Sequence, residues 1–97
     1  MLPDRSPANV ISRQLLRCGT SVGANFRAAC RAKSHLDFIA KLKIVEEECD
    51  ESIYWLELLS NLNIGNASYV KNLLIEANQI LSIIVASIKT ARRTPNS

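Results

Sequence analysis

The sequence predicts an all-α protein, an antiparallel up-down helical bundle forming a single domain over residues 1–97. Its length is sufficient for one modest core. Only three Gly and three Pro interrupt the chain, and apolar residues recur at spacings of three and four, which is the helical repeat. We expect three long helices, over residues 7–32, 35–62 and 67–93.

The first expected helix has an apolar face and a basic face. Ser6 suits its N-cap and Pro7 its first helical position. The apolar face, expected in the core, comprises Ile11, Leu15, Cys18, Val22, Phe26 and Ala29. Gly19 and Gly23 each cost about 1 kcal/mol relative to Ala. They indicate either that another backbone packs closely here or that this helix is weak.

The second expected helix follows a Ser34 N-cap, with Asp37 placed to complete a capping box. Its main apolar stripe, at core-facing spacing, comprises Phe38, Leu42, Val45, Cys49, Ile53 and Leu56. A weaker stripe lies roughly opposite. Because a helix that is apolar on two sides is normally buried on two sides, we expect this stripe to form an oligomer interface. The stripe comprises Ala40, Ile44, Trp55 and Leu58, with Tyr54 alongside, and the expected interface residues are Ile44, Tyr54, Trp55 and Leu58.

The third expected helix follows Gly65, which suits a helix C-terminal turn, and Asn66, which suits an N-cap. Its core face comprises Val70, Leu73, Ala77, Ile80, Leu81, Ile84, Ile88 and Ala91.

The most apolar segment, from Ile80 to Ile88, is too short to span a bilayer. No signal-peptide pattern is present, and the three cysteines show no Cys-x-x-Cys spacing. We therefore expect a cytoplasmic protein with no membrane partner.

Charge is unevenly distributed, although the net charge is only +3. From Arg5 to Lys43, eight basic residues accompany Asp37 as the one acidic residue, whereas residues 44–57 contain six acidic residues and no basic one. A basic face on the first helix can contact successive phosphates of RNA or DNA. The candidate nucleic-acid-binding residues are Arg13, Arg17, Arg27, Arg31 and Lys33.

An alternative explanation of the same charges is internal pairing, in which Arg13 and Arg17 bind the acidic segment across the fold. Its expected partners are Glu46, Glu47 or Asp50. The sequence leaves both explanations open.

The sequence contains no arrangement typical of catalysis. His35 is the one histidine and stands at a helix start, and the Gly19-x-x-x-Gly23 segment lacks the lysine of a phosphate-binding loop. A di-iron centre in a helical bundle would need Glu-x-x-His pairs. We therefore expect no enzymatic activity, no catalytic residues, no metal and no cofactor.

Several segments carry a resemblance to a known family: Gln14-Leu15-Leu16-Arg17, residues 20–25, residues 37–42, Glu48-x-x-Glu51, residues 54–59 and residues 87–92. In these segments the chain resembles the four-helix-bundle proteins encoded within 23S ribosomal RNA intervening sequences. The resemblance implies a four-helix bundle that assembles into a homopentameric barrel without known enzymatic activity.

One relative in that family is the accessory protein of diversity-generating retroelements, which works with a reverse transcriptase and binds nucleic acid. This likeness implies that Arg17 and Arg27 contact nucleic acid or a neighbouring subunit. It also implies a polymerase or reverse transcriptase as a partner.

The chain departs from that family in two ways. Family members begin with another long amphipathic helix that ends near a Leu-Pro like Leu2-Pro3, so this copy is expected to lack the first helix. Either the start codon is placed late or the protein is a true three-helix remnant. In the second case an open apolar groove would remain, and closure by another subunit, or poor solubility, would follow. Ala28 stands where the family usually has Glu, which makes the basic face more positive.

Taken together, these features predict a non-enzymatic homo-oligomer, expected to be a pentamer, that binds structured RNA or DNA through its basic helical face as an accessory factor. One alternative is an oligomeric protein–protein scaffold that does not bind nucleic acid. A defective gene product lacking its first helix is another.

Overall fold

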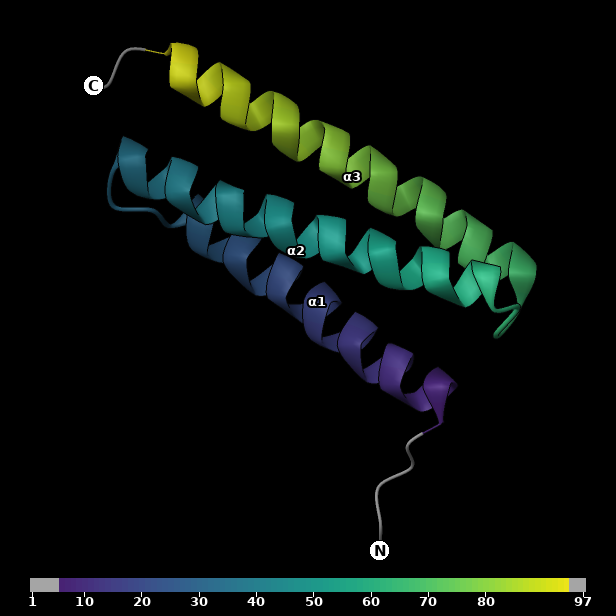
Figure 1. Ribbon diagram of the computed structural model, residues 1–97. Coiled ribbons are helices and arrows are strands. Elements are labelled where there is room, and N and C mark those ends of the chain that lie inside the picture. The colour runs from purple at the N-terminus through teal and green to yellow at the C-terminus, as the bar shows by residue number, and fades with distance from the viewer. Residues whose placement is uncertain (1–5, 95–97) are drawn as a thin grey trace, which may run out of the picture.

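The computed structural model describes residues 6–94, which form three antiparallel helices and no strand. The helices are α1 (Pro7–Cys30), α2 (His35–Asn61) and α3 (Ala67–Arg93). Figure 1 shows α2 between the other two. In the described part of the chain α2 packs against both neighbours, and α1 does not pack against α3. The result is a slab of 51 × 31 × 13 Å, open on the side where α1 and α3 face each other.

All three helices begin at the N-caps that the sequence predicts. Each cap side chain accepts a hydrogen bond from the backbone N–H three residues later: Ser6 from Asn9 at 3.3 Å, Ser34 from Asp37 at 3.0 Å and Asn66 from Tyr69 at 2.9 Å. Gly65 has a φ of +81°, the left-handed conformation that glycine adopts without a Cβ penalty. Local sequence therefore determines where each helix starts.

The predicted helix ends are slightly too late for two helices. α1 ends at Cys30 and α2 at Asn61, whereas α3 has the predicted bounds. The early end of α1 follows from the next cap, since Ser34 is extended (φ −153°, ψ 166°) and the chain must turn before it. The Asp37 carboxylate accepts from the backbone N–H of Lys33 rather than that of Ser34, so the expected capping box is only half formed.

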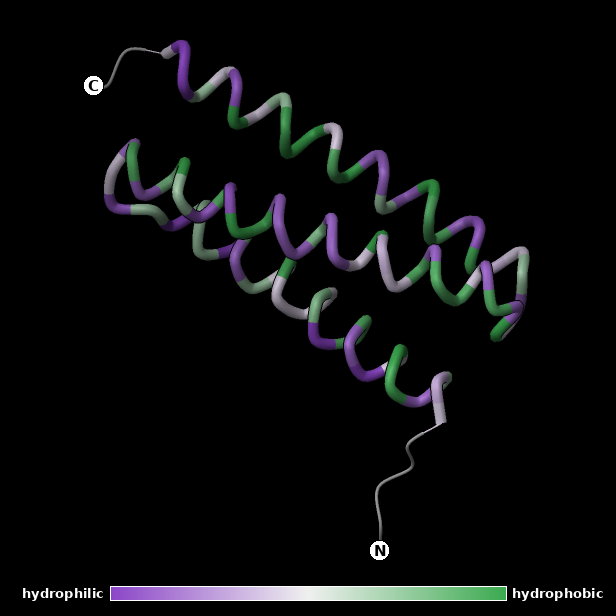
Figure 2. The backbone as a smooth tube through the Cα atoms, in the orientation of Figure 1, coloured by the Kyte–Doolittle hydropathy of each residue, from purple (hydrophilic) through white to green (hydrophobic). Residues whose placement is uncertain are grey.

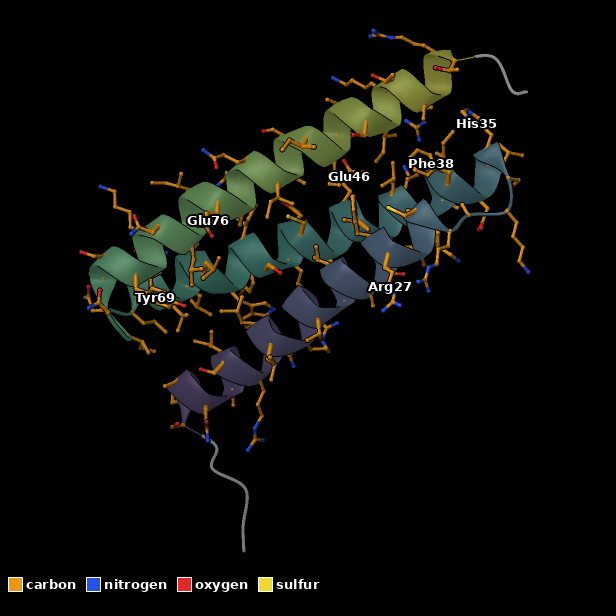
Figure 3. The ribbon with its side chains drawn as sticks, turned by 180° about the vertical axis from the view of Figure 1, so that it is seen from behind. Arg27, His35, Phe38, Glu46, Tyr69 and Glu76 are labelled. Carbon is orange, nitrogen blue, oxygen red and sulfur yellow. The ribbon has the colours of Figure 1, made fainter. Side chains whose placement is uncertain are left out.

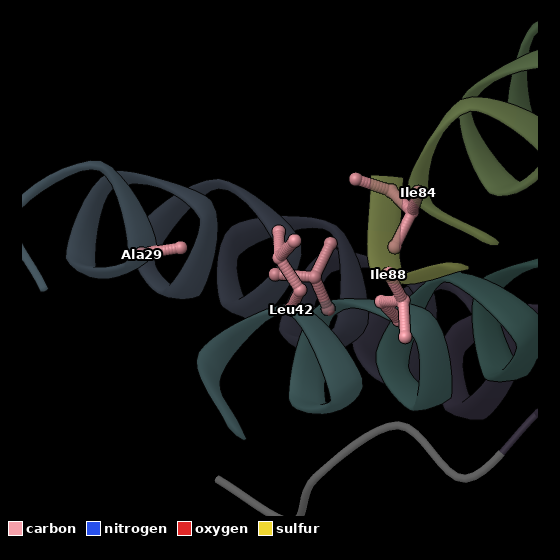
Figure 4. Packing of buried hydrophobic residues seen from close by; sticks show 5 residues of the cluster. Ala29, Leu42, Ile84 and Ile88 are labelled. Atoms are coloured by element: carbon pink, nitrogen blue, oxygen red, sulfur yellow. The ribbon is translucent and has the colours of Figure 1, made fainter. Parts of the chain in front are cut away.

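The core lies along α2 in two clusters. The first, shown in part in Figure 4, contains Ala29, Leu42, Val45, Ile84 and Ile88. The second contains Ile11, Leu56, Leu59 and Val70. The predicted main stripe of α2 is confirmed as core, because Phe38 packs against the first cluster and its other members are buried.

Two predicted core residues are exposed in this chain. Phe26 of α1 is 47% exposed and Ile80 of α3 is 44% exposed. Both face the open side of the slab, where they line the same hollow. The prediction is wrong for them because α1 and α3 both pack on α2 and not on each other.

Figure 2 shows apolar residues recurring among polar ones along all three helices. By length and composition, α3 can cross a membrane: an 18-residue window has a mean hydropathy of 1.4, and 11% of that window is buried. The expectation drawn from Ile80 to Ile88 considered only one third of this helix. Such a window is weak evidence for membrane insertion, because core helices of soluble bundles have the same composition.

Candidate nucleic-acid interface

Antiparallel packing brings three helix ends together at one end of the molecule. Figure 1 shows the end of α1, the start of α2 and the end of α3 at the same side. His35 connects the start of α2 to the end of α3, since its Nε2 donates a hydrogen bond to the carbonyl oxygen of Ala91 at 2.6 Å. That carbonyl is among the last four of α3, which have no partner within the helix.

This end of the molecule is strongly basic, and we call it the basic end. Its basic residues are Arg27, Arg31, Lys33, Lys41, Lys43, Lys89, Arg92 and Arg93. All except the half-buried Lys41 are exposed. The one acidic residue among residues 27–43 and 87–93 is Asp37, whose carboxylate lies 3.7 Å from the Lys41 ammonium. The summed field of such a cluster attracts a polyanion.

The candidate nucleic-acid-binding residues predicted on the first helix do not all lie at the same end of the molecule. Arg27, Arg31 and Lys33 lie at the basic end, and Figure 3 shows Arg27 on the same half of the molecule as His35. Arg13 is exposed but lies about 20 Å from Arg27 along the helix axis, at 1.5 Å per residue.

Arg17 pairs with the acidic segment. Its Nη1 lies 3.3 Å from Glu48 Oε2, its Nη2 pairs with Glu51, and its Nε donates to Gln14 at 3.2 Å. The alternative of internal pairing therefore holds for Arg17. The expected partners Glu46, Glu47 and Asp50 were wrong, because it is Glu48 and Glu51 whose side chains reach α1.

A buried thiol belongs to the same network. Cys18 is fully buried and donates a hydrogen bond to Glu51 Oε2 at 2.5 Å. Burial, followed by the hydrogen bond to the Glu51 carboxylate, raises the pKa of this thiol to about 12. In return, the hydrogen bond from Cys18, followed by that from Arg17, lowers the pKa of Glu51. Thiol and carboxylate thus hold opposite protonation states around neutral pH.

These groups also resemble a metal-ligand set, which the sequence pattern does not predict. The ligand atoms of Cys18, Glu48 and Glu51 all lie within 4.8 Å of one another. Both carboxylates already pair with the Arg17 guanidinium, and Glu51 also accepts a hydrogen bond from the Cys18 thiol. The arrangement therefore fits an internal ion-pair network better than a metal centre.

Three basic residues of α3 were missed as candidates for phosphate binding. Lys89, Arg92 and Arg93 lie near the C-terminus of α3, where cations interact favourably with the helix dipole, and they are not among the candidate nucleic-acid-binding residues predicted from the sequence. They join the basic end because α3 runs parallel to α1 and antiparallel to α2. The up-down topology, which the sequence does predict, was the signal that could have identified them.

Of the four residues expected in the oligomer interface on α2, two are exposed and two pack within the chain. Ile44 and Tyr54 are exposed. Trp55 and Leu58 are half-buried and pack within the chain against the second core cluster. The rings of Tyr54 and Trp55 meet edge to face at 4.9 Å and 73°. Within residues 6–94 the buried Nε1 of Trp55 has no hydrogen-bond partner.

Comparison with known proteins identifies the family. The chain resembles a crystal structure of a protein of unknown function from the S23 ribosomal protein family of Bacteroides thetaiotaomicron, with 40% identity and a TM-score of 0.79. The match covers 82% of this chain and 74% of that one. A search of curated proteins finds no match. The model of the 23S rRNA-intervening sequence protein family matches residues 3–86, and the chain therefore belongs to that family.

Proposed function

We propose that this protein is a non-enzymatic accessory factor that binds structured RNA or DNA through the basic end. The observation that carries the proposal is the convergence of three helix ends, with Asp37 as the one acidic residue among eight basic ones. It refines the expectation of a stripe along α1, because Arg17 is held by Glu48 and Glu51.

The chemistry of the basic end favours binding that tolerates many sequences. Lysine and arginine side chains spread over three helix ends suit phosphates that follow a curved backbone, and phosphate contacts carry no sequence information directly. A folded RNA or a duplex presents such a backbone. We therefore expect affinity to depend strongly on salt and weakly on sequence.

We also propose that the protein acts in the cytoplasm as a homo-oligomer, a pentamer by resemblance to its family, and that a polymerase or reverse transcriptase is a partner. The exposure of Ile44 and Tyr54 on the back of α2 supports a subunit contact there. We do not include Trp55 and Leu58 in the proposed subunit contact, because their side chains pack inside the chain.

The test is a fluorescence-anisotropy titration of a structured RNA and a duplex DNA at about 50 and 200 mM salt, where several phosphate contacts cost orders of magnitude in affinity. The variant Arg31→Gln/Arg92→Gln removes two charges from the basic end. We expect weaker binding of both nucleic acids and, on a duplex, a salt slope that is shallower by about 0.9 for each phosphate the variant leaves unneutralised.

The matched control is Arg13→Gln/Lys71→Gln, which removes two exposed charges at the opposite end of α1 and α3. It should bind as the unmodified protein does. Equal weakening by both variants would mean that only overall charge matters. No binding at low salt by a well-formed oligomer would instead favour the second candidate, a protein–protein scaffold, for which the exposed apolar side chains of α1 and α3 provide the surface.

A further inference from the structure

His35 lies at the basic end, and it differs from the cations there because an imidazole can gain or lose its charge near neutral pH. It is the one histidine of the chain and the first residue of α2. Figure 3 shows it at the end of the molecule where α2 begins and α3 ends. Lysine and arginine keep their charges throughout the neutral range. A change in the charge of the basic end near neutral pH therefore points to His35.

The two ring nitrogens of His35 have different surroundings. Nε2 lies 2.6 Å from the carbonyl oxygen of Ala91, and because a carbonyl only accepts hydrogen bonds, Nε2 carries the proton of the neutral ring. Nδ1 makes no hydrogen bond within residues 6–94. Among these residues Trp55 Nε1 is the one buried side-chain nitrogen or oxygen without a partner, so Nδ1 is open to solvent. Nδ1 is therefore the atom that can take up a proton and donate it to a ligand.

Two helix ends act on this ring in opposite directions. The Ala91 carbonyl belongs to the last turn of α3, where the helix dipole favours positive charge, and a hydrogen bond to it is stronger from a charged ring. His35 is also the first residue of α2, where the helix dipole favours negative charge. Because the two dipoles oppose each other, the charge of a ligand beside the ring can decide its protonation state.

The charged side chains at this end attract a ligand of negative charge. Asp37 is already engaged, because its carboxylate lies 3.7 Å from the Lys41 ammonium and accepts a hydrogen bond from the backbone N–H of Lys33. The exposed cations nearest the helix ends along the chain are Arg31, Lys33, Lys89, Arg92 and Arg93. A phosphate backbone held by these cations brings negative charge to the same end of the molecule as His35.

We propose that protonated His35 binds a phosphate of the nucleic acid through Nδ1–H, so that binding takes up a proton from the solvent and strengthens as pH falls. This inference rests on the nucleic-acid binding proposed above and adds a residue that makes it depend on pH. In the complex, Nε2–H keeps its hydrogen bond to the Ala91 carbonyl and holds the ring in place, while Nδ1–H donates to a phosphate oxygen. Proton uptake and binding promote each other by the same factor, because the two equilibria are linked.

The first test is a fluorescence-anisotropy titration of an RNA hairpin at about pH 7.5 and about pH 5.5, a range that spans the protonation of an ordinary imidazole. The salt concentration is low and constant. His35→Gln keeps an N–H that can reach the Ala91 carbonyl but cannot take up a proton. Arg31→Gln is the matched control, since it removes a permanent charge from the same end.

We expect the affinity of the unmodified protein for the hairpin to be at least about threefold higher at the lower pH, and that of His35→Gln to stay constant. Arg31→Gln should bind more weakly at both pH values and gain by the same factor as the unmodified protein. Equally tight binding by the unmodified protein at both pH values, or an equal gain in His35→Gln, overturns the role of His35 and leaves the nucleic-acid binding in place. No binding at either pH overturns both.

A second measurement tests the proposal without a variant, and so does not depend on whether His35→Gln folds. The ring C–H signals of His35 in isotope-labelled protein are followed by NMR as pH is lowered, with and without the RNA hairpin. We expect the midpoint of this titration to lie at higher pH in the complex, because the bound phosphate stabilises the charged ring. A midpoint that is unchanged or lower in the complex overturns the proposal.

Discussion

The buried thiol of Cys18 on α1 donates a hydrogen bond to the carboxylate of Glu51 on α2 across 2.5 Å. The same carboxylate pairs with Arg17, which is exposed beside the thiol. This contact joins the first two helices about midway along their length. Since an apolar thiol and a charged pair meet at one point, the contact gives stability a particular dependence on pH.

We expect the free energy of unfolding to fall as pH rises into the alkaline range, because of Cys18. A cysteine in the unfolded chain ionises near its ordinary pKa of 9.0, whereas the folded thiol keeps its proton up to about pH 12. The contribution of the protonated Cys18 thiol to the free energy of unfolding is therefore complete below pH 9 and is lost as pH rises towards 12. Urea denaturation at about pH 8 and about pH 10 measures it. Between these two pH values the free energy of unfolding should fall less in Cys18→Ala than in the unmodified protein. An identical fall in both would contradict the assignment of this pH dependence to Cys18.

Arg17→Gln is expected to lower the melting temperature by a few degrees at neutral pH while leaving RNA and DNA binding unchanged. The reason is that Arg17 supports Glu48 and Glu51 and is not free to bind phosphate. Because the pKa of Glu51 is lowered in the folded state, the network is complete above the ordinary Glu value of 4.5 and is lost as pH falls through the folded-state pKa. The difference in melting temperature should accordingly shrink in acid. A loss of RNA affinity in a stable Arg17→Gln protein would sink this interpretation.

His35→Ala is expected to destabilise the protein by roughly 1–2 kcal/mol, because it leaves the Ala91 carbonyl at the end of α3 without its hydrogen bond. Denaturant titration measures the change. His35→Gln offers an N–H that can reach the same carbonyl and should recover part of the loss. If the Gln and Ala variants are equally destabilised, packing of the ring rather than the hydrogen bond accounts for the effect.

Trp55→Ala is expected to lower the free energy of unfolding by roughly 3 kcal/mol, near the lower end of the range for buried large aromatic residues. The side chain packs against the second core cluster and is half-buried. Tyr54→Ala on the exposed side serves as control and should affect stability much less. The sequence pattern instead places both residues in a subunit interface, so a stable Trp55→Ala protein with reduced oligomer mass would support the interface.

Short stretches of sequence are enough to predict the local structure of this protein. Capping side chains such as Ser34 and Asn66 act on neighbouring backbone groups, and helical periodicity depends only on spacing. The three helices, their starts and most of the core along α2 could therefore be predicted, and Arg27, Arg31 and Lys33 were recognised as a basic group.

Which surfaces meet depends instead on how the helices pack. The pairing of Arg17 with Glu48 and Glu51 depends on helix rotation. Antiparallel packing between segments far apart in the sequence brings the end of α3, which carries Lys89, Arg92 and Arg93, to the same side of the molecule as the end of α1. The exposure of Phe26 and Ile80 has the same origin. Periodicity identifies an apolar face, but whether another helix covers that face is a property of the packed layer, and this layer leaves its α1–α3 side open.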